Sequence, residues 1–366
     1  MLSLFCSPSR YVQGRDATAQ LGHQMQMAGL RGPAYILASD RISTLLNRVW
    51  SQSLRAAEID FVVGQFGGEC SDPEISSGTS RARDAHAQVI IGAGGGKALD
   101  TARAIAANLD LPIVNCPTLA SSDAPCSALS VVYQPDGSFD RYIFYPRNPE
   151  LVLVDTSVVA QAPRRHLVSG MGDALATWFE ARTVSEAHRP NQVHGGTTVA
   201  ALALARLCYE TLLADGPAAA QAVEASVITP ALERLIEANT LLSGLGFESG
   251  GLAIAHSVHN GLTTAEATHA FMHGEKVAFG LLVQLIVEGQ PSAELDEVAG
   301  FARAVGLPTT LAELGLTSPN DSQLRLIAER TVAEGETAHN EPFPVTASMI
   351  YDGILAADHY GRSRDR

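Results

Sequence analysis

The first half of the chain alternates short apolar runs with longer stretches of helical spacing. Ala34-Tyr-Ile-Leu-Ala38 is apolar throughout, follows Gly32-Pro33 and ends at Ser39-Asp40, which is typical of a buried parallel strand. Helical spacing fills residues 43–58 and 97–109. This alternation predicts a twisted parallel sheet covered by helices. Further strands are predicted at 59–63, 88–91, 112–115 and 151–154.

One pair of segments interrupts this alternation. Residues 128–133 and 139–144 are rich in β-branched and aromatic side chains, and Gln134-Pro-Asp-Gly137 separates them. Proline followed by Asp-Gly between two such runs predicts a β-hairpin.

The pattern changes after Asp155, where the strand-like runs stop and Ala162-Pro-Arg-Arg165 marks a boundary. A chain of 366 residues exceeds what one hydrophobic core usually holds. We therefore expect an α/β domain at 1–162 and an all-α helical domain at 163–366, with the cleft between them as the default site. Helices of the second domain are predicted at 171–185, 197–213, 230–245, 250–262, 275–287, 294–305, 323–333 and 347–360.

Composition narrows the class of protein. The formal net charge of −14, without a concentrated basic patch, disfavours nucleic acid and anionic membranes as partners. Neither a signal peptide nor a bilayer-spanning apolar run is expected. The five cysteines are an odd number without a C-x-x-C pair, which argues against a disulfide framework and favours a reducing, cytoplasmic location.

A glycine-rich turn is the first candidate binding element. Gly92-Ala-Gly-Gly-Gly-Lys97 joins a predicted strand directly to a predicted helix, so the helix N-terminus would present backbone N–H groups to an anion, with pyrophosphate the best candidate. Ile91 and Ala98 exclude a Walker A loop, and Lys97 replaces the last glycine of G-x-G-x-x-G. A tight turn without a ligand is the alternative.

The loop after the next strand is the second candidate. Residues 117–125 are small, polar and bounded by prolines, and ligands of open α/β sheets bind at the edge where such loops lie. Thr118, Ser121 and Asp123 are therefore placed to bind a cofactor or polyol. Their sequence alone agrees equally well with ordinary turn and capping residues.

Four histidines within eighteen residues make the third candidate, a metal centre. His256 and His259 are three residues apart in an apolar helical run, and His269 and His273 are four apart. This spacing predicts two neighbouring helical faces that carry imidazoles, the commonest transition-metal ligands. Asp173, expected in the first turn of a helix, is a candidate carboxylate ligand or merely a capping residue.

Taken together, these segments resemble the zinc-dependent glycerol dehydrogenase branch of the iron-containing alcohol dehydrogenase superfamily. The resemblance implies a Rossmann-like domain followed by a helical domain, as in dehydroquinate synthase. It also implies a homo-oligomer, an octamer-type ring. The matching segments are 11–14, 92–101, 117–133, 149–155, 173–178, 239–251, 256–261, 273–280 and 333–339.

The resemblance assigns the metal ligands to Asp173, His256 and His273. Iron-dependent members carry a histidine one turn after the aspartate, where this chain has Thr177, so zinc is favoured. Gly172 departs from the alanine common at that position and could loosen the aspartate.

The resemblance also implies an NAD site and a polyol site. Asp40 would bind the free ribose hydroxyl and repel a 2′-phosphate, which favours NAD over NADP. Asp123 corresponds to the residue that binds the polyol, together with the three metal ligands, and is a candidate catalytic residue with His256 and His273. The remaining NAD-site positions are Gly95, Gly96, Lys97, Asp100, Thr118, Ser121, Ser127, Leu129 and Tyr133.

The implied reaction is oxidation of glycerol or a related vicinal diol to dihydroxyacetone or its analogue, and the reverse reduction. Alternatives on the same scaffold are a dehydrogenase of another polyol or polyol phosphate, and a dehydroquinate synthase-like lyase. Phosphorylated substrates need several basic residues, and the candidate segments offer mainly Lys97 and Lys276. A non-catalytic NAD-binding or metal-sensing protein is a further alternative.

Overall fold

The computed structural model describes residues 1–134 and 137–363. These residues form two compact units, which we call the sheet unit and the helical unit. The sheet unit comprises Ser7–Pro163 and Ala222–Leu241, and the helical unit comprises Met1–Cys6, Arg164–Gln221 and the chain from Leu242 onward. The expected single division after residue 162 would place residues 1–6 with the sheet and residues 222–241 with the helices. The contacts place residues 1–6 in the helical unit and residues 222–241 in the sheet unit.

Within the described residues, six parallel strands form the sheet of the first unit in the order β1-β8-β5-β4-β2-β3. The predicted parallel α/β architecture is confirmed. The four-residue edge strand β1 was not predicted, because a run this short shows no clear period. The strands are β1 (Tyr11–Gly14), β2 (Ala34–Ala38), β3 (Phe61–Gln65), β4 (Val89–Gly94), β5 (Ile113–Pro117) and β8 (Leu151–Asp155).

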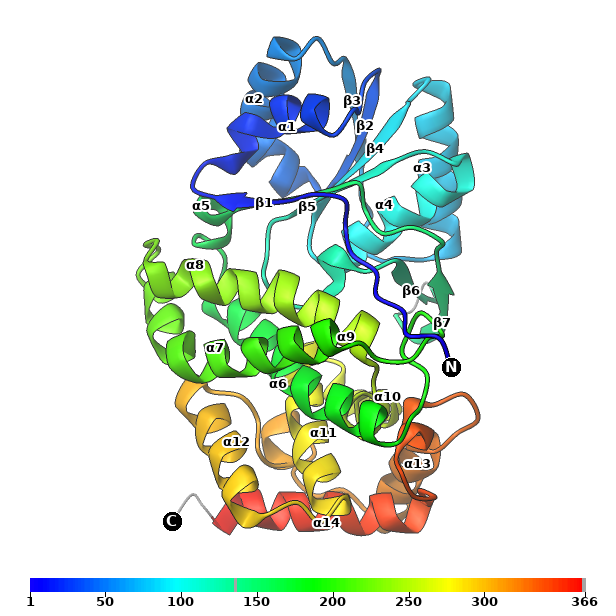
Figure 1. Ribbon diagram of the computed structural model, residues 1–366, viewed down its shortest axis with the longest axis vertical. Coiled ribbons are helices and arrows are strands. Elements are labelled where there is room, and N and C mark those ends of the chain that lie inside the picture. Colours follow the sequence, from blue (N-terminus) through cyan, green and yellow to red (C-terminus); the bar gives the residue numbers. More distant parts are fainter. Residues whose placement is uncertain (135–136, 364–366) are drawn as a thin grey trace. The chain divides into compact units, whose positions relative to one another are not determined.

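Helices cover both faces of this sheet (Figure 1). Side chains such as Leu21 and Trp50 pack on one face with Ile36, while Ile75 and Ile105 pack on the other. A sheet buried on both faces explains why β2, β4, β5 and β8 read as continuous apolar runs. The covering helices are α1 (Leu21–Met27), α2 (Asp40–Ala56), α3 (Asp72–Asp84) and α4 (Gly96–Leu109).

The predicted hairpin is present as the antiparallel pair β6 (Leu129–Tyr133) and β7 (Phe139–Phe144). The central residues of its predicted turn, 135 and 136, lie outside the described residues.

The helical unit confirms the all-helical prediction for most of the second half. The predicted helix 230–245 is instead α8 (Pro230–Glu237), a π-helical turn (Ala238–Leu242) and α9 (Ser243–Gly250), and α8 belongs to the sheet unit. The short helix α5 (Thr156–Val159) precedes the boundary. The other helices are α6 (Arg164–Glu186), α7 (Val199–Glu224), α10 (Ile254–Leu262), α11 (His273–Val287), α12 (Ser292–Val305), α13 (Asp321–Thr331) and α14 (Ala347–Ser363).

Helix α6 packs closely against α11, and glycines make this approach possible. A Cβ atom on Gly274 would lie 1.8 Å from the carbonyl oxygen of Ser169, and one on Gly172 would lie 2.3 Å from the carbonyl oxygen of Gly274. Neither distance is compatible with a side chain, so the two backbones are in direct contact. This contact brings the middle of α6 to the first residue of α11.

Candidate metal centre and nucleotide-binding edge

Asp173 lies in the middle of α6 and is completely buried. The prediction that it occupies the first turn of a helix is wrong, because α6 begins nine residues earlier, at Arg164. Asp173 is therefore not a capping residue. A buried carboxylate is costly unless charged or hydrogen-bonding groups face it, so its position calls for partners.

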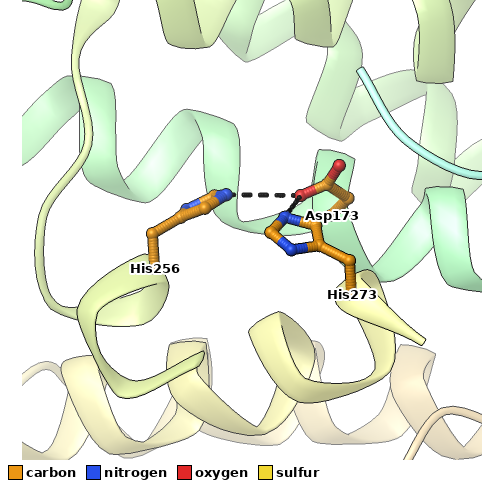
Figure 2. Close-up of side chains that lie close together, drawn as sticks. All are labelled: Asp173, His256 and His273. Atoms are coloured by element: carbon orange, nitrogen blue, oxygen red, sulfur yellow. Dashed lines mark ion pairs between the residues drawn. The ribbon is translucent and has the colours of Figure 1, made fainter. Parts of the chain in front are cut away.

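Two histidines supply these partners (Figure 2). His256 lies in the first turn of α10, and its Nε2 is 3.3 Å from Oδ1 of Asp173. His273 is the first residue of α11, and its Nε2 is 3.1 Å from the same oxygen. One ligand atom from each of the three residues lies within 4.8 Å of the others. The structure therefore brings together the three residues that the resemblance assigned to the metal.

The electrostatics of the cluster follow from burial and proximity. Burial alone would raise the pKa of Asp173, but the imidazoles of His273 and His256 hold it well below its usual range. Burial would lower the pKa of His256, but the carboxylates of Glu180 and Asp173 raise it well above its ordinary value. Asp173 and His256 thus stabilise one another in charged form, and a divalent cation would take the place of the proton between them.

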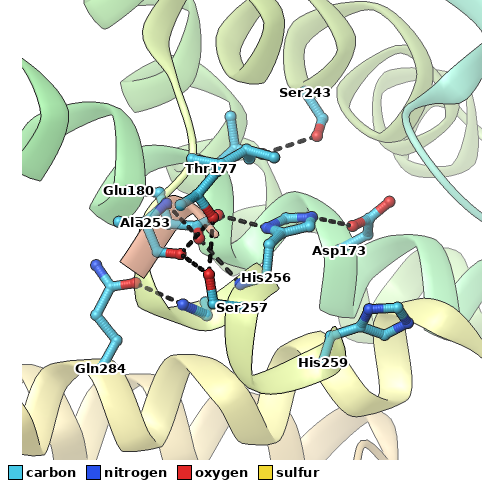
Figure 3. A network of polar contacts seen from close by, with 12 residues as sticks. Asp173, Thr177, Glu180, Ser243, Ala253, His256, Ser257, His259 and Gln284 are labelled. Atoms are coloured by element: carbon cyan, nitrogen blue, oxygen red, sulfur yellow. Dashed lines mark hydrogen bonds and ion pairs between the residues drawn. The ribbon is translucent and has the colours of Figure 1, made fainter. Parts of the chain in front are cut away.

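Glu180 holds His256 from the side opposite Asp173 (Figure 3). Its Oε2 is 2.6 Å from Nδ1 of His256, while its Oε1 accepts the backbone N–H groups of Ala253 (2.9 Å) and His256 (3.1 Å). Gln284 accepts the adjacent N–H of Ala255. Side chains from α6 and α11 therefore cap α10, whose N-cap residue, Ala253, has no side chain able to do so.

Sequence reasoning missed Glu180. It lies seven residues after Asp173, two helical turns along the same face of α6, and this spacing is the only signal in the sequence. A histidine that binds a metal commonly donates its second ring N–H to a carboxylate, which fixes the tautomer and the ring orientation. The Glu180–His256 contact has this geometry.

The other ligand helix, α11, is capped locally. Glu275 accepts the backbone N–H of the N-cap residue Met272 at 2.7 Å, at the N-terminus of the helix. Arg165 of α6 pairs with the same carboxylate through two hydrogen bonds of 2.6 and 2.7 Å. Both helices that carry a histidine ligand are thus anchored to α6.

The remaining two histidines of the cluster have different surroundings. His259 lies on α10, and its Nε2 is 3.0 Å from Nδ1 of His273. Burial, reinforced by His273 and Lys276, lowers the pKa of His259 well below its ordinary value. His269 is exposed, follows a short 3-10 turn and bonds the carbonyl oxygen of Thr263, so its predicted place on a helical face is wrong.

Two further positions bear on the metal centre. Thr177, one turn after Asp173, is buried and shares a hydrogen bond of 2.8 Å with Ser243. It offers no imidazole at the position where the resemblance implies one for iron-dependent members. Gly172, which was expected to loosen the aspartate, lies in the tight contact between α6 and α11, where a Cβ atom would not fit.

The nucleotide-site candidates gather at one edge of the sheet. Strands β2, β4 and β5 are neighbours in register, with Ala38 opposite Ala93 and Gly94 opposite Pro117. Asp40, Gly95 and Thr118 follow the carboxyl ends of these strands. In parallel sheets this edge binds ligands, and the N-terminus of α4 adds backbone donors. The predicted strand-turn-helix at the glycines is confirmed.

Two of the candidates have internal roles. Asp100 is buried, accepts a hydrogen bond from Arg103 at 2.9 Å and accepts another from the N–H of Val131 at 3.2 Å. Ser127 is buried and donates to the carbonyl oxygen of Ala124. Asp100 thus holds the hairpin against α4, and Ser127 forms a hydrogen bond within the loop that precedes the hairpin.

The other candidates lie in the same unit. Lys97 is exposed, pairs with Glu69 at 2.6 Å and lies over the ring of Tyr133. Gly96 is the first residue of α4, and Leu129 and Tyr133 begin and end β6. Ser121 is partly buried and Asp123 is buried. Asp123 therefore belongs to the sheet unit, whereas the metal-ligand cluster belongs to the helical unit.

Within residues 1–134 and 137–363, no helix has both the length and the apolar character needed to cross a bilayer.

Residues 8–156 match the profile of the family described as iron-containing alcohol dehydrogenase. With full-length relatives at about half identity, described next, the chain belongs to this family.

Within the family, the chain is similar to named glycerol dehydrogenases. The enzyme of Thermotoga maritima is 50% identical over 365 residues, which cover 100% of this chain and 99% of that protein. The crystal structure of glycerol dehydrogenase from Schizosaccharomyces pombe has a TM-score of 0.94 at 40% identity, covering 98% of this chain and 91% of that chain. A glycolaldehyde reductase of Halobacterium salinarum is 48% identical over 100% of both chains.

Proposed function

We propose that the protein is an NAD-dependent dehydrogenase that oxidises glycerol or a related vicinal diol at a zinc ion held by Asp173, His256 and His273. The observation that carries this proposal is the convergence of these three side chains on one point. The names of the full-length relatives supply the substrate class. In the reverse direction the enzyme would reduce dihydroxyacetone.

The ligand set fits zinc. Tetrahedral zinc with bonds of about 2.0–2.1 Å keeps ligand atoms about 3.3 Å apart, and the two histidine nitrogens lie 3.3 and 3.1 Å from Oδ1 of Asp173. Two imidazoles and one carboxylate leave a coordination position open, as catalytic zinc sites do. The absence of a third imidazole at Thr177 favours zinc over iron.

Each residue has a definite task in this proposal. Bound zinc would act as a Lewis acid that lowers the pKa of a substrate hydroxyl. Asp173 and the two histidines hold their lone pairs toward one point, and Glu180 keeps the His256 ring in position. Asp123 is proposed to bind the polyol through its carboxylate.

The sheet unit is proposed to bind the dinucleotide. NAD would accept the hydride, and the N–H groups at the N-terminus of α4 would face its pyrophosphate. Asp40 is exposed at the start of α2, where a carboxylate suits a free ribose hydroxyl and repels a 2′-phosphate.

Two further proposals concern the location and the oligomeric state of the protein. The five free cysteines support a cytoplasmic location, and the family resemblance supports a homo-oligomeric ring.

A second candidate substrate is glycolaldehyde, because the Halobacterium salinarum relative is named for its reduction and, at 48% identity, is as similar to this chain as several of the glycerol dehydrogenases. Glycolaldehyde also carries two adjacent oxygens. The same residues would serve both reactions, so the choice between them is one of relative rate.

The test is NADH formation with glycerol, 1,2-propanediol and simple alcohols, together with NADH consumption with dihydroxyacetone and glycolaldehyde. Each assay is run before chelation, after chelation and after zinc is restored. We expect diol-dependent activity that is lost with the chelator and regained with zinc. Activity that survives complete zinc removal would contradict the metal assignment. If no diol and neither carbonyl compound reacts, the proposed substrate class is wrong.

A further inference from the structure

His259 joins the ligand His273 to a chain of hydrogen bonds that leads away from the cluster. Nδ1 of His273 is 3.0 Å from Nε2 of His259, and Nδ1 of His259 is 3.1 Å from Oδ1 of Asn260. The amide nitrogen of Asn260 donates to both carboxylate oxygens of Glu336, at 3.0 and 3.3 Å. Glu336 in turn forms an ion pair with Arg330.

The outer end of this chain is firmly placed. The residues just after Glu336 are tied to the N-terminal part of α10, because Thr337 donates to the carbonyl oxygen of Ala253 and the N–H of Ala338 donates to Ser257. The Glu336 side chain is only 8% exposed. Its carboxylate is therefore a fixed acceptor beside Asn260.

The direction of every hydrogen bond follows from that acceptor. Because a carboxylate only accepts, Asn260 must turn its NH₂ group to Glu336 and its oxygen to His259. Nδ1 of His259 must then carry a hydrogen, and in the neutral ring Nε2 is the acceptor. Nδ1 of His273 must donate to it, so in the neutral ring of His273 the lone pair is on Nε2. That nitrogen lies 3.1 Å from Asp173, in the ligand cluster.

We propose that His259 is a positioning residue for His273: it accepts the Nδ1 hydrogen and, with Asn260 and Glu336, fixes the tautomer and ring orientation in which Nε2 binds the metal. This inference rests on the proposed metal site. It gives the half-exposed ligand His273, whose side chain is 38% exposed, a neutral orienting partner in place of a carboxylate.

The geometry distinguishes this role from simple packing. The two ring nitrogens lie within hydrogen-bond distance, at 3.0 Å, and the ring planes meet at 64° with centroids 4.2 Å apart. An apolar ring in place of His259 would fill the same space without accepting a hydrogen bond. A glutamine would place an amide oxygen near the position of Nε2.

The experiment compares His259→Phe with His259→Gln in the full-length protein. Zinc affinity is measured by competition with a chromophoric chelator, and the visible spectrum of the Co²⁺-loaded protein reports ligand geometry. We expect His259→Phe to weaken zinc binding about 10- to 100-fold, the usual loss when the partner of a ligand is removed, and to alter the Co²⁺ spectrum. His259→Gln should restore most of the affinity and the wild-type spectrum.

His269→Phe is the matched control, because His269 lies in the same segment but takes no part in the hydrogen bonds that join His273 to Glu336. The His269→Phe variant should bind zinc as the wild type does. Thermal melting of the metal-free variants identifies any that fail to fold, and His259→Met replaces His259→Phe in that case. The proposal is wrong if His259→Phe, or the His259→Met variant that replaces it, binds zinc with wild-type affinity. It is also wrong if His259→Gln binds zinc as weakly as His259→Phe does. If the wild type itself binds no zinc, the proposed metal site fails instead.

Discussion

The two proposed histidine ligands are held by opposite kinds of surroundings. His256 has a side chain only 11% exposed and contacts a buried carboxylate, Glu180, that also caps its helix. His273 is 38% exposed and contacts a neutral histidine, while its helix is capped separately by Glu275. One side thus combines helix capping and ring orientation in a single residue, and the other divides them. Substitutions on the two sides should therefore affect stability and metal binding to different degrees.

The largest effect is expected on the His256 side, from Glu180→Leu. This change leaves two backbone N–H groups and one ring N–H without their acceptor. Since each buried donor left unpaired costs about 1–3 kcal/mol, the free energy of unfolding should fall by about 3 kcal/mol or more. Chemical denaturation of the metal-free protein measures this loss.

Glu180→Gln separates the two tasks of Glu180, capping of α10 and orientation of the His256 ring. Its amide oxygen still accepts the two backbone N–H groups, so the fold should persist. Its NH₂ group would face Nδ1 of His256 and favour the tautomer that carries hydrogen on Nε2. Zinc affinity should then fall about 10- to 100-fold with little change in stability. Equal zinc binding by wild type and Glu180→Gln would contradict the assigned role of Glu180.

The next largest effect is expected on the His273 side, from Gly274→Ala. The new Cβ would lie 1.8 Å from the carbonyl oxygen of Ser169 and 2.8 Å from the backbone nitrogen of Asp173, so α11 must move away from α6. Overpacking of this kind costs about 1–3 kcal/mol. We expect a lower melting temperature and weaker zinc binding together.

Gly300→Ala is the matched control, since it is also a helical glycine and its Cβ would meet nothing within 4 Å. Because alanine favours helix over glycine by about 1 kcal/mol, this variant should be slightly more stable than the wild type. If Gly274→Ala is as stable as Gly300→Ala, the backbone contact does not set the position of His273.

The sequence predicted the sheet, most helices and the metal ligands to different extents. Continuous apolar runs sufficed for strands such as β2, because burial on both faces leaves a strong local signal. The spacing of the histidines pointed to a site but gave equal weight to His269, which the chain places in an exposed loop because α11 begins only at His273. The family resemblance, not the spacing, selected the two histidines that the structure places beside Asp173.

The environment of the ligands could not be predicted from the sequence. Asp173 was expected in the first turn of a helix, yet α6 begins at Arg164 and Gly172 serves a contact with α11 that only the tertiary structure shows. Glu180 and Glu336 act on residues 76 positions away, His256 and Asn260. Interactions over such separations leave no periodic pattern in one chain.

The last prediction concerns how the free energy of unfolding changes with pH, and it involves a carboxyl group on the His256 side. Burial, together with the carboxylates of Glu288 and Glu180, raises the pKa of Glu341 to about 9, and the N–H of Ile254 in α10 opposes this shift only partly. Burial also raises the pKa of Glu288, with Arg182 opposing. Glu341 therefore remains protonated in the folded protein at neutral pH.

A raised pKa means that the folded state holds a proton that the unfolded chain has released. Between about pH 4.5, where an unfolded glutamate titrates, and about pH 9, this group makes the wild type less stable by about 1.4 kcal/mol per pH unit. Glu341→Gln, which resembles the protonated form, removes this pH-dependent loss of stability. In urea unfolding of the metal-free proteins at pH 6, 7 and 8, the free energy of unfolding of the variant should rise relative to that of the wild type with each pH unit. A constant difference would mean that Glu341 is charged in the fold, and that the carboxylates near α10 are compensated as fully as Glu275 is by Arg165 beside α11.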